Sequence, residues 1–221
     1  MKTLKKKCLF FDHDDTLINS QETIHYPIFL ETLSLLRPTA SQPSFKDFVM
    51  LSNHYGFEGY LKEIYQFTND EIALEIKWWR KKVMQKEAEA FEDVVLLLQE
   101  FVAAGGLIVV YSYSESMMIN RDYRRLFGFL PHHIIGFDND PHKRKPARLP
   151  LLEVMAQFNL TAKDCLIVDD MPMLIETSFR SNIDMVAACW ALGATWQWSN
   201  IECDTPQCKN ASCLASYVFM D

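Results

Sequence analysis

The stretch of sequence that decides the fold is KCLFFDHDDT, residues 7–16. It begins as a short apolar run and ends abruptly in the polar residues 12–16. A continuous apolar run of this kind is typical of a strand that is buried on both faces of a parallel sheet. Open α/β sheets bind ligands at the carboxyl ends of their strands. The stretch therefore predicts a buried first strand, with Asp12 and Asp14 at the edge of the sheet where ligands bind.

The chain beyond residue 90 alternates short apolar runs with amphipathic segments. The apolar runs predict strands over residues 107–111, 134–137, 165–168 and 185–188, with a last strand at 217–219. The amphipathic segments predict helices over residues 91–104, 116–127, 149–158 and 173–180. Strands that alternate with helices in this way form doubly wound parallel sheets. We therefore expect an α/β fold with a Rossmann-like core.

Residues 19–90 follow a different pattern. Apolar residues recur there at i, i+3 and i+4 spacing, which predicts helices over residues 23–36, 44–54, 59–66 and 70–89. Asn69 and Asp70 are expected to provide the N-cap of the last helix. No convincing strand interrupts this region. We expect residues 19–90 to form a small helical domain, inserted into an α/β core made of residues 1–18 and 91–221.

The composition is that of an ordinary globular protein. Of the 221 residues, 49% are apolar and 23% are charged. The net charge is −7, whereas proteins that bind nucleic acid usually carry a basic excess. No apolar run is long enough for a signal peptide or a membrane span. We expect a cytoplasmic monomer or homodimer that binds neither nucleic acid nor membrane.

The six cysteines fall into two groups. Three of them have apolar neighbours and are expected to be small buried side chains: Cys8, Cys165 and Cys189. The others have C-x4-C-x4-C spacing in a polar segment: Cys203, Cys208 and Cys213. That spacing is not typical of a zinc site. In a reducing cytosol we expect these three to be free thiols, rather than metal ligands or disulfide partners.

Polar side chains follow three of the predicted strands, and a lysine lies in the loop after a fourth. These residues are Asp12, Asp14, Ser112, Asp169, Asp170 and Lys145. They are expected at one edge of the sheet, where the carboxylates would repel one another without a cation. Mg²⁺ takes carboxylate oxygens as ligands and leaves room for a phosphate. A lysine and a hydroxyl can then hold the phosphate oxygens, so these residues predict a site for Mg²⁺ and a small phosphorylated substrate.

In this order and at these spacings, the motifs resemble those of the haloacid dehalogenase-like hydrolases, most of which are Mg²⁺-dependent phosphatases. Residues 10–17 resemble the first motif of the family, D-x-D-x-T after a hydrophobic strand. The resemblance implies that Asp12 is the nucleophile and Asp14 the general acid and base. It also implies that Thr16 helps to fix the loop.

Three later motifs are matched by Ser112, by Lys145 before Pro146, and by the pair Asp169–Asp170. The resemblance implies that Ser112 donates a hydrogen bond to the phosphoryl group. The substrate-binding residues it implies are Thr16, Ser112, Tyr113 and Lys145. The metal ligands it implies are Asp12, Asp14 (through its backbone carbonyl), Asp170 and, in an outer position, Asp169.

Four positions depart from the commonest family pattern. Leu174 stands where many members have a further Asp, and Tyr113 stands where many have Asn. Asp169 and Asp15 stand where Gly is common, although other members also have an acid at these two places. The resemblance also implies that the helical insertion is a cap that closes over the site. Each motif by itself has a structural explanation as well: an Asx-turn, a strand-end hydroxyl or a solvated basic loop.

Together, the motifs predict a hydrolase that removes a phosphoryl group from a small metabolite through an aspartyl-phosphate on Asp12. A phosphomutase with the same site is an alternative. A binding module that has lost turnover is another, supported by Leu174 and by the cysteine-bearing C-terminal segment. A dehalogenase is disfavoured because Asp14 is present, and hydrolysis of a carbon–halogen bond needs no acid to protonate the leaving group.

Overall fold

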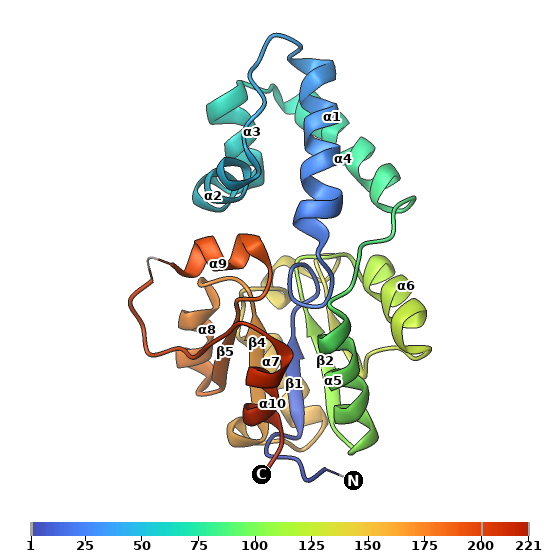
Figure 1. Cartoon of the computed structure of the whole chain (residues 1–221), viewed down its shortest axis with the longest axis vertical. Helices are drawn as coiled ribbons and strands as arrows, with labels where there is room; N and C mark the ends of the chain where they lie inside the picture. The colour runs from blue at the N-terminus through green and yellow to red at the C-terminus, as the bar shows by residue number, and fades with distance from the viewer. Residues whose placement is uncertain (1, 200, 221) are drawn as a thin grey trace. The chain divides into compact units, whose positions relative to one another are not determined.

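The computed structural model describes residues 2–199 and 201–220. The chain divides into two compact units, which are described separately (Figure 1). One unit, the sheet unit, consists of Met1–Ile18 and Ala90–Asp221. The other, the helical unit, is Asn19–Glu89.

The sheet unit is built on six parallel strands in the order β3-β2-β1-β4-β5-β6. Their bounds are β1 (Cys8–Phe11), β2 (Leu107–Tyr111), β3 (His133–Ile135), β4 (Cys165–Asp169), β5 (Asp184–Ala188) and β6 (Gln207–Cys208). In β1, the central Phe10 pairs with Val109 on one side and Ile167 on the other. All four residues of β1 are fully buried, as its unbroken apolar sequence predicts. The predicted doubly wound parallel sheet is confirmed.

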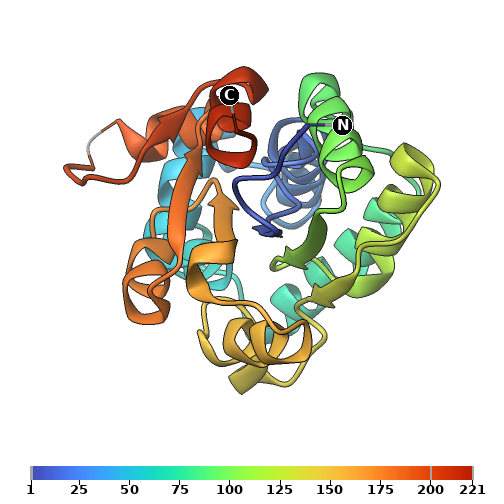
Figure 2. The ribbon, with the colours of Figure 1, turned by 90° about the horizontal axis from the view of Figure 1, so that it is seen from below.

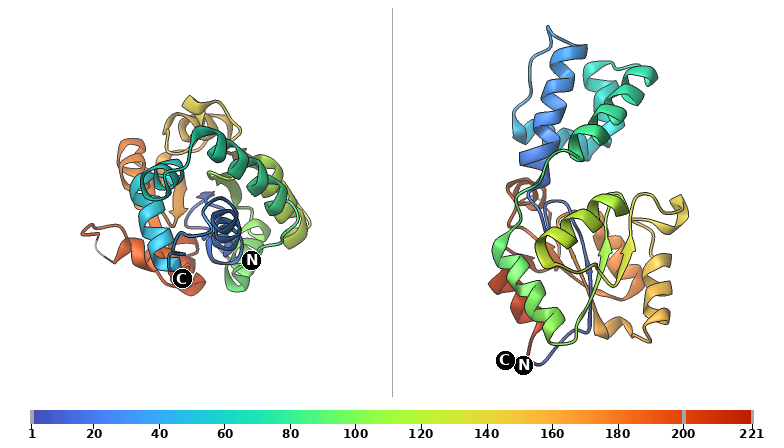
Figure 3. Two further views of the ribbon diagram at one scale, coloured as in Figure 1. Left: turned by 90° about the horizontal axis from the view of Figure 1, so that it is seen from above. Right: turned by 90° about the vertical axis from the view of Figure 1, so that its right-hand side faces the viewer.

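Helices cover both faces of this sheet. The helices of the sheet unit are α5 (Glu92–Ala103), α6 (Ser116–Phe127), α7 (Leu149–Gln157), α8 (Leu174–Ser181), α9 (Leu192–Trp198) and α10 (Ala211–Val218), of which α9 lies near the carboxyl ends of the strands (Figure 1). Short 3-10 turns lie at Pro141–Lys143 and Ala162–Asp164. Helices α5 and α10 lie side by side on one face, while α7 and α8 lie on the other (Figures 2 and 3).

The C-terminal segment differs from the sequence-based expectation. The strand predicted at 217–219 is wrong, because residues 211–218 form α10. The Asn210 side chain accepts a hydrogen bond from the backbone N–H of Cys213 at 2.9 Å and caps this helix. Three buried apolar residues at helical spacing attach it to the sheet unit: Ala211, Leu214 and Val218. Strand β6 and helix α9 are also additional to the predicted elements.

The expectation of free thiols is wrong for two of the three C-terminal cysteines. Cys208, at the end of β6, and Cys213, in the first turn of α10, form a disulfide with a Cα–Cα distance of 5.4 Å. The tight connection between β6 and α10 brings them together, although their sequence spacing alone did not indicate this pairing. Cys203 is exposed and free. Cys8 and Cys165 are buried and free, and they face each other across β1 and β4.

The helical unit contains a π-helical segment, η1 (Gln21–His25), and four α-helices. These are α1 (Tyr26–Leu36), α2 (Phe45–Tyr55), α3 (Phe57–Tyr65) and α4 (Asn69–Val83). Aromatic side chains form its core: the ring of Phe29 lies 5.1 Å from that of Phe48 and 5.5 Å from that of Tyr60, centroid to centroid. Such ring contacts add to the free energy gained from burying the side chains.

Helix α4 begins one residue earlier and ends six residues sooner than the pattern predicts. Its N-cap is Thr68 rather than Asn69 or Asp70, since the Thr68 side chain accepts from the N–H of Glu71. The Glu71 carboxylate in turn accepts from the N–H of Thr68, which completes a capping box. Arg37 binds this carboxylate through two nitrogens, at 2.6 and 2.8 Å, and helps to hold the pKa of Glu71 at about 2. No helix among the described residues is long and apolar enough to cross a membrane.

Glu75 on α4 is buried, and among the described residues neither carboxylate oxygen has a hydrogen-bond partner. Burial raises the pKa of Glu75 to about 7, against the opposing effect of His25. The folded protein therefore takes up a proton at Glu75 at a higher pH than the unfolded chain, and stability should rise as pH falls from 8 to 5. Glu75→Gln should flatten this dependence and stabilise the protein at pH 8 by up to about 3 kcal/mol. Urea denaturation at several pH values measures both effects.

The matched control is Glu63→Gln, on the exposed surface of α3. It should keep the pH profile of the unmodified protein. An identical pH profile for Glu75→Gln would show that Glu75 does not titrate in this range.

Candidate functional site

The loop after β1 brings Asp12 to the edge of the sheet. The Asp12 N–H donates to the Val168 carbonyl at 3.0 Å, so the residue continues the pairing of β1 with β4. The chain then turns: Asp15 has a φ of 54°, and the N–H groups of Leu17 and Ile18 both donate to the carbonyl of His13. A positive φ is tolerated by Asp better than by most residues. The loop therefore doubles back and leaves the Asp12 carboxylate close to the end of β4.

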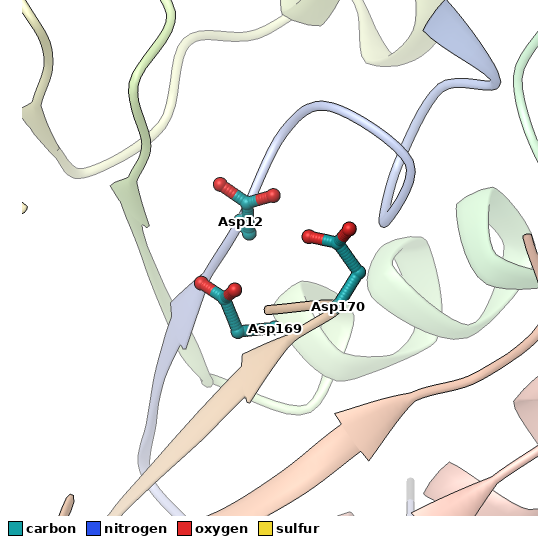
Figure 4. Close-up of side chains that lie close together, drawn as sticks. All are labelled: Asp12, Asp169 and Asp170. Carbon is teal, nitrogen blue, oxygen red and sulfur yellow. The ribbon is translucent and has the colours of Figure 1, made fainter. Parts of the chain in front are cut away.

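Asp169 and Asp170 occupy the end of β4. Because β4 lies beside β1 in register, these carboxylates are close to Asp12. One carboxylate oxygen from each of the three residues can be chosen so that all lie within 4.8 Å of one another. Figure 4 shows the three side chains extending from neighbouring strand ends toward a common region. All three residues are buried, with exposures of 3% or less.

Burial makes this cluster of negative charge unfavourable for the metal-free protein. Burial raises the pKa of Asp169 to about 7, despite the opposing effect of Lys145. Burial also raises the pKa of Asp170 well above its usual value, and the carboxylates of Asp12 and Asp169 add to the shift. Both shifts show that the ionised cluster lacks sufficient compensating charge.

Lys145 provides part of that compensation. Its ammonium Nζ lies 2.6 Å from Asp169 Oδ2 and 3.2 Å from Asp12 Oδ1. Burial favours a lower pKa for Lys145, but the carboxylates of Asp12 and Asp169 outweigh it and raise the pKa above its usual value. Lys145 is therefore a fully buried cation bridging the acids of two strands.

The donor set fits a hard divalent cation. Mg²⁺ prefers oxygen ligands, and this cluster offers carboxylate oxygens at a buried, negatively charged position. Asp12 and Asp170 are better placed to give oxygens to a metal than Asp169, because Asp169 is engaged by Lys145 and by the N–H of Met171 at 2.9 Å. The residues present thus fit a magnesium ion by the chemistry and closeness of their oxygens.

The structure places Asp14 apart from the three clustered carboxylates. The Ser114 hydroxyl donates to Asp14 Oδ2 at 2.5 Å. Ser112, which follows β2, accepts from the N–H of Ser114 at 3.2 Å. Ser114 is a site residue that sequence reasoning missed, although a second hydroxyl two residues after Ser112 was a visible signal.

Thr16 and Tyr113 lie beside the cluster. The Thr16 hydroxyl donates to Asp12 Oδ2 at 3.4 Å. The ammonium of Lys145 lies 5.3 Å from the centroid of the Tyr113 ring, within the range of a cation–π contact. The Tyr113 hydroxyl donates to the sulfur of Met173 at 3.7 Å. The structure thus places these two candidates against the acids and the lysine that they were expected to accompany.

A second buried pair was not apparent from the sequence. His13 Nε2 lies 3.2 Å from Asp122 Oδ2, and both side chains are almost completely buried. Arg121 donates to the same carboxylate at 2.9 and 3.0 Å. This contact ties the loop that carries Asp12 to helix α6. Leu174 stands where many members of the family that the motifs resemble have Asp. Its side chain is buried in the apolar core of the sheet unit.

Comparison with known proteins gives a family and several similar folds. The model of the haloacid dehalogenase-like hydrolase family matches residues 9–188. No curated protein matches the sequence. Among solved structures, a haloacid dehalogenase-like family hydrolase from Streptococcus pneumoniae is 20% identical, with a TM-score of 0.74 over 96% of this chain and 99% of that one.

Two further structures carry more specific names. A predicted phosphoglycolate phosphatase from Haemophilus somnus is 20% identical, with a TM-score of 0.65 over 83% of this chain and 85% of that one. CbbY from Rhodobacter sphaeroides, in complex with phosphate, is 14% identical, with a TM-score of 0.71 over 95% of this chain and 96% of that one. At such low identity the likeness shows that the fold is shared.

The position of Lys145 predicts a large effect on stability. In Lys145→Met, the buried carboxylates of Asp12 and Asp169 lose their cation, which should cost about 3 kcal/mol in metal-free protein. Lys143→Met is the matched control from the same loop. It removes an exposed ion pair with Glu153, and such pairs contribute about 1 kcal/mol or less. Equal, small losses in urea denaturation of the two variants would contradict the role given to Lys145.

Proposed function

The chain belongs to the haloacid dehalogenase-like hydrolase family, and from this premise we propose that it is a Mg²⁺-dependent phosphatase acting on small phosphorylated compounds. The observation that carries the proposal is the buried cluster of Asp12, Asp169 and Asp170 with Lys145 in contact. A buried excess of negative charge at strand ends favours a divalent cation, and the cation and the lysine together favour a phosphate. The names of two similar structures, a phosphoglycolate phosphatase and a protein in complex with phosphate, support the same substrate class.

In this proposal Asp12 is the nucleophile. One carboxylate oxygen of Asp12 attacks phosphorus, and the bond from phosphorus to the leaving oxygen breaks, which gives an aspartyl-phosphate. Lys145 is 3.2 Å from this carboxylate and can neutralise charge on the phosphoryl oxygens as they approach. The hydrogen bond from Thr16 orients the carboxylate for the attack.

Asp14 has the second role. Its proton passes to the leaving oxygen in the first step. In the second step, Asp14 takes a proton from the water that attacks phosphorus, and Asp12 is released as a carboxylate together with inorganic phosphate. The hydrogen bond from the Ser114 hydroxyl fixes the position of the Asp14 carboxylate for these proton transfers.

Asp12, Asp170 and the backbone carbonyl of Asp14 are the groups that we propose hold the magnesium ion, with Asp169 in the outer shell. When bound, Mg²⁺ supplies positive charge that offsets the carboxylates and the phosphate, and it helps to orient the substrate. Thr16, Ser112, Tyr113 and Lys145 are the proposed contacts to the substrate. The helical unit is proposed to be the cap that selects it.

The first functional prediction concerns the nucleophile. Asp12→Asn should lower the release of phosphate from an aryl phosphate by more than about a thousandfold, because an amide does not form the phospho-enzyme. The change is nearly isosteric and removes one buried negative charge, so the variant should fold. A phosphate-release assay with and without Mg²⁺ measures the effect. Asp204→Asn, in an exposed loop, is the control and should keep full activity.

Two results would contradict the proposal. Near-normal activity of Asp12→Asn would remove Asp12 as the nucleophile. Absence of Mg²⁺-dependent phosphate release by the unmodified protein, across a panel of phosphorylated metabolites and aryl phosphates, would remove the phosphatase function itself.

A second prediction separates the two acids of the first motif. Asp14→Asn should slow the first step most for alkyl phosphates, whose leaving groups need a proton, and less for aryl phosphates. With an aryl phosphate, the variant should release a burst of phenol and then turn over slowly, because no base activates the second-step water. Rapid-quench measurements resolve both phases. Equal losses for alkyl and aryl substrates, without accumulated phospho-enzyme, would rule out this division of roles.

A further inference from the structure

Two tryptophans that follow β5 bind the backbone of the two acidic loops. The indole N–H of Trp198 donates to the carbonyl of Asp170 at 2.6 Å. The indole N–H of Trp190 donates to the carbonyl of Thr16 at 3.0 Å. The two acceptors belong to different loops, one after β4 and one after β1, whereas both donors lie within one short segment.

The Asp170 carbonyl lies where the sheet no longer supports the chain. The last residue of β4 that pairs with β5 is Asp169, opposite Ala187, so Asp170 lies beyond the ladder. Trp198 is 2% exposed, and its indole provides the hydrogen bond that a buried carbonyl requires. The bond fixes the peptide plane after Asp170, and with it the direction in which the Asp170 side chain leaves the backbone.

The Thr16 carbonyl is held in a comparable way. Thr16 also donates from its hydroxyl to Asp12 Oδ2, so its position affects the carboxylate of the proposed nucleophile. The N–H groups around the turn bind within the loop itself, to the carbonyls of His13 and Ile18. Trp190 therefore connects the backbone of this loop to the segment that follows β5.

Such positioning is needed because the carboxylates repel one another. Asp12, Asp169 and Asp170 lie together at a buried position, where the repulsion is strong. Without a fixed backbone, Asp170 could move away from Asp12 and separate the oxygens that a metal must find close together. Groups that hydrogen-bond to metal ligands and orient them commonly affect metal affinity, which changes when these groups are removed.

We propose that Trp198 and Trp190 are positioning residues, whose indole N–H groups set the separation of the acidic loops and so preorganise the metal site. The inference rests on the proposed function, since it concerns the same cluster of acids. It goes further by assigning a role to the segment that follows β5 and includes α9, which no motif includes. Neither indole touches the substrate or the reacting atoms in this scheme.

The test is a change that keeps the ring and removes the N–H. Trp198→Phe should bind Mg²⁺ roughly tenfold more weakly than the unmodified protein in isothermal titration calorimetry. Trp190→Phe should weaken binding less, because this side chain is half-buried and acts on Asp12 only through Thr16, whereas Trp198 binds Asp170 itself. Circular dichroism and thermal unfolding establish that each variant is folded at the temperature of the titration.

The matched control is Trp79→Phe. Trp79 also donates its indole N–H in a hydrogen bond, to His25 Nδ1 at 2.9 Å, but within the helical unit. Its loss should lower stability without changing affinity for Mg²⁺. Unchanged affinity in a folded Trp198→Phe would overturn the inference, because a purely structural indole affects stability alone.

A second measurement decides the matter if Trp198→Phe does not fold. In the unmodified, ¹⁵N-labelled protein, the indole N–H resonance of Trp198 should move when Mg²⁺ saturates the site, while that of Trp79 stays in place. A Trp198 resonance unchanged at saturation would contradict the inference. If the unmodified protein binds no Mg²⁺, or if Asp170→Asn binds it equally well, the proposed metal site fails and the inference falls with it. By contrast, normal Mg²⁺ binding that does not depend on Trp198 would contradict only the inference and would leave the proposed metal site in place.

Discussion

The repulsion among three carboxylates that are buried at the ends of β1 and β4 is the constraint around which the sheet unit is arranged. Charged groups in a protein interior are costly unless they are paired or hydrogen-bonded. Here Lys145 lies between Asp12 and Asp169, and the N–H of Met171 binds the latter. The parallel register of β1 and β4 holds Asp12 close to Asp169, because all four residues of β1 pair with β4. The stability of the apolar core therefore maintains an arrangement of charges that is unfavourable by itself.

Glu75 shows how differently a buried acid behaves where such support is lacking. It is as inaccessible as the acids of the sheet unit, but no lysine or backbone N–H among the described residues binds its oxygens. A single carboxyl group can relieve its burial by taking up a proton. Asp12 and Asp169 have the ammonium of Lys145 in contact, and with Asp170 they form a donor set suited to magnesium. The cost of burying an acid is thus left to protonation in one unit, whereas a buried lysine offsets part of it in the other.

The sequence predicted those parts of the protein whose causes are local. An apolar run followed at once by Asp, as at Phe11–Asp12 and Val168–Asp169, is sufficient to identify a buried strand and an acid at its end. Strand β6 was not predicted, because two residues are too few to form a recognisable pattern. Helix α9 was not predicted, because its packing depends on Trp198. The indole of Trp198 binds the carbonyl of Asp170, which lies 28 residues earlier in the chain.

Asp122 escaped for a related reason. Its neighbours in sequence, Arg121 and Arg125, make it resemble one charge of a solvated helix face, although its carboxylate is fully buried against His13. The Cys208–Cys213 disulfide likewise depends on how β6 and α10 meet. Contacts of this kind depend on tertiary structure and cannot be predicted from periodicity in the sequence.

The place where the chain leaves the sheet unit and returns to it has a consequence for how such proteins can change. Ile18 and Ala90 form an antiparallel bridge, and just beyond it the N–H of Asn19 donates to the carbonyl of Glu89 at 2.8 Å. The first and last residues of the helical unit are therefore hydrogen-bonded to each other. Loop closure costs little more when such an insertion is lengthened. The helical unit can thus be exchanged for one of another size as a module, by recombination or by design, while the strand register and the acids of the sheet unit stay as they are.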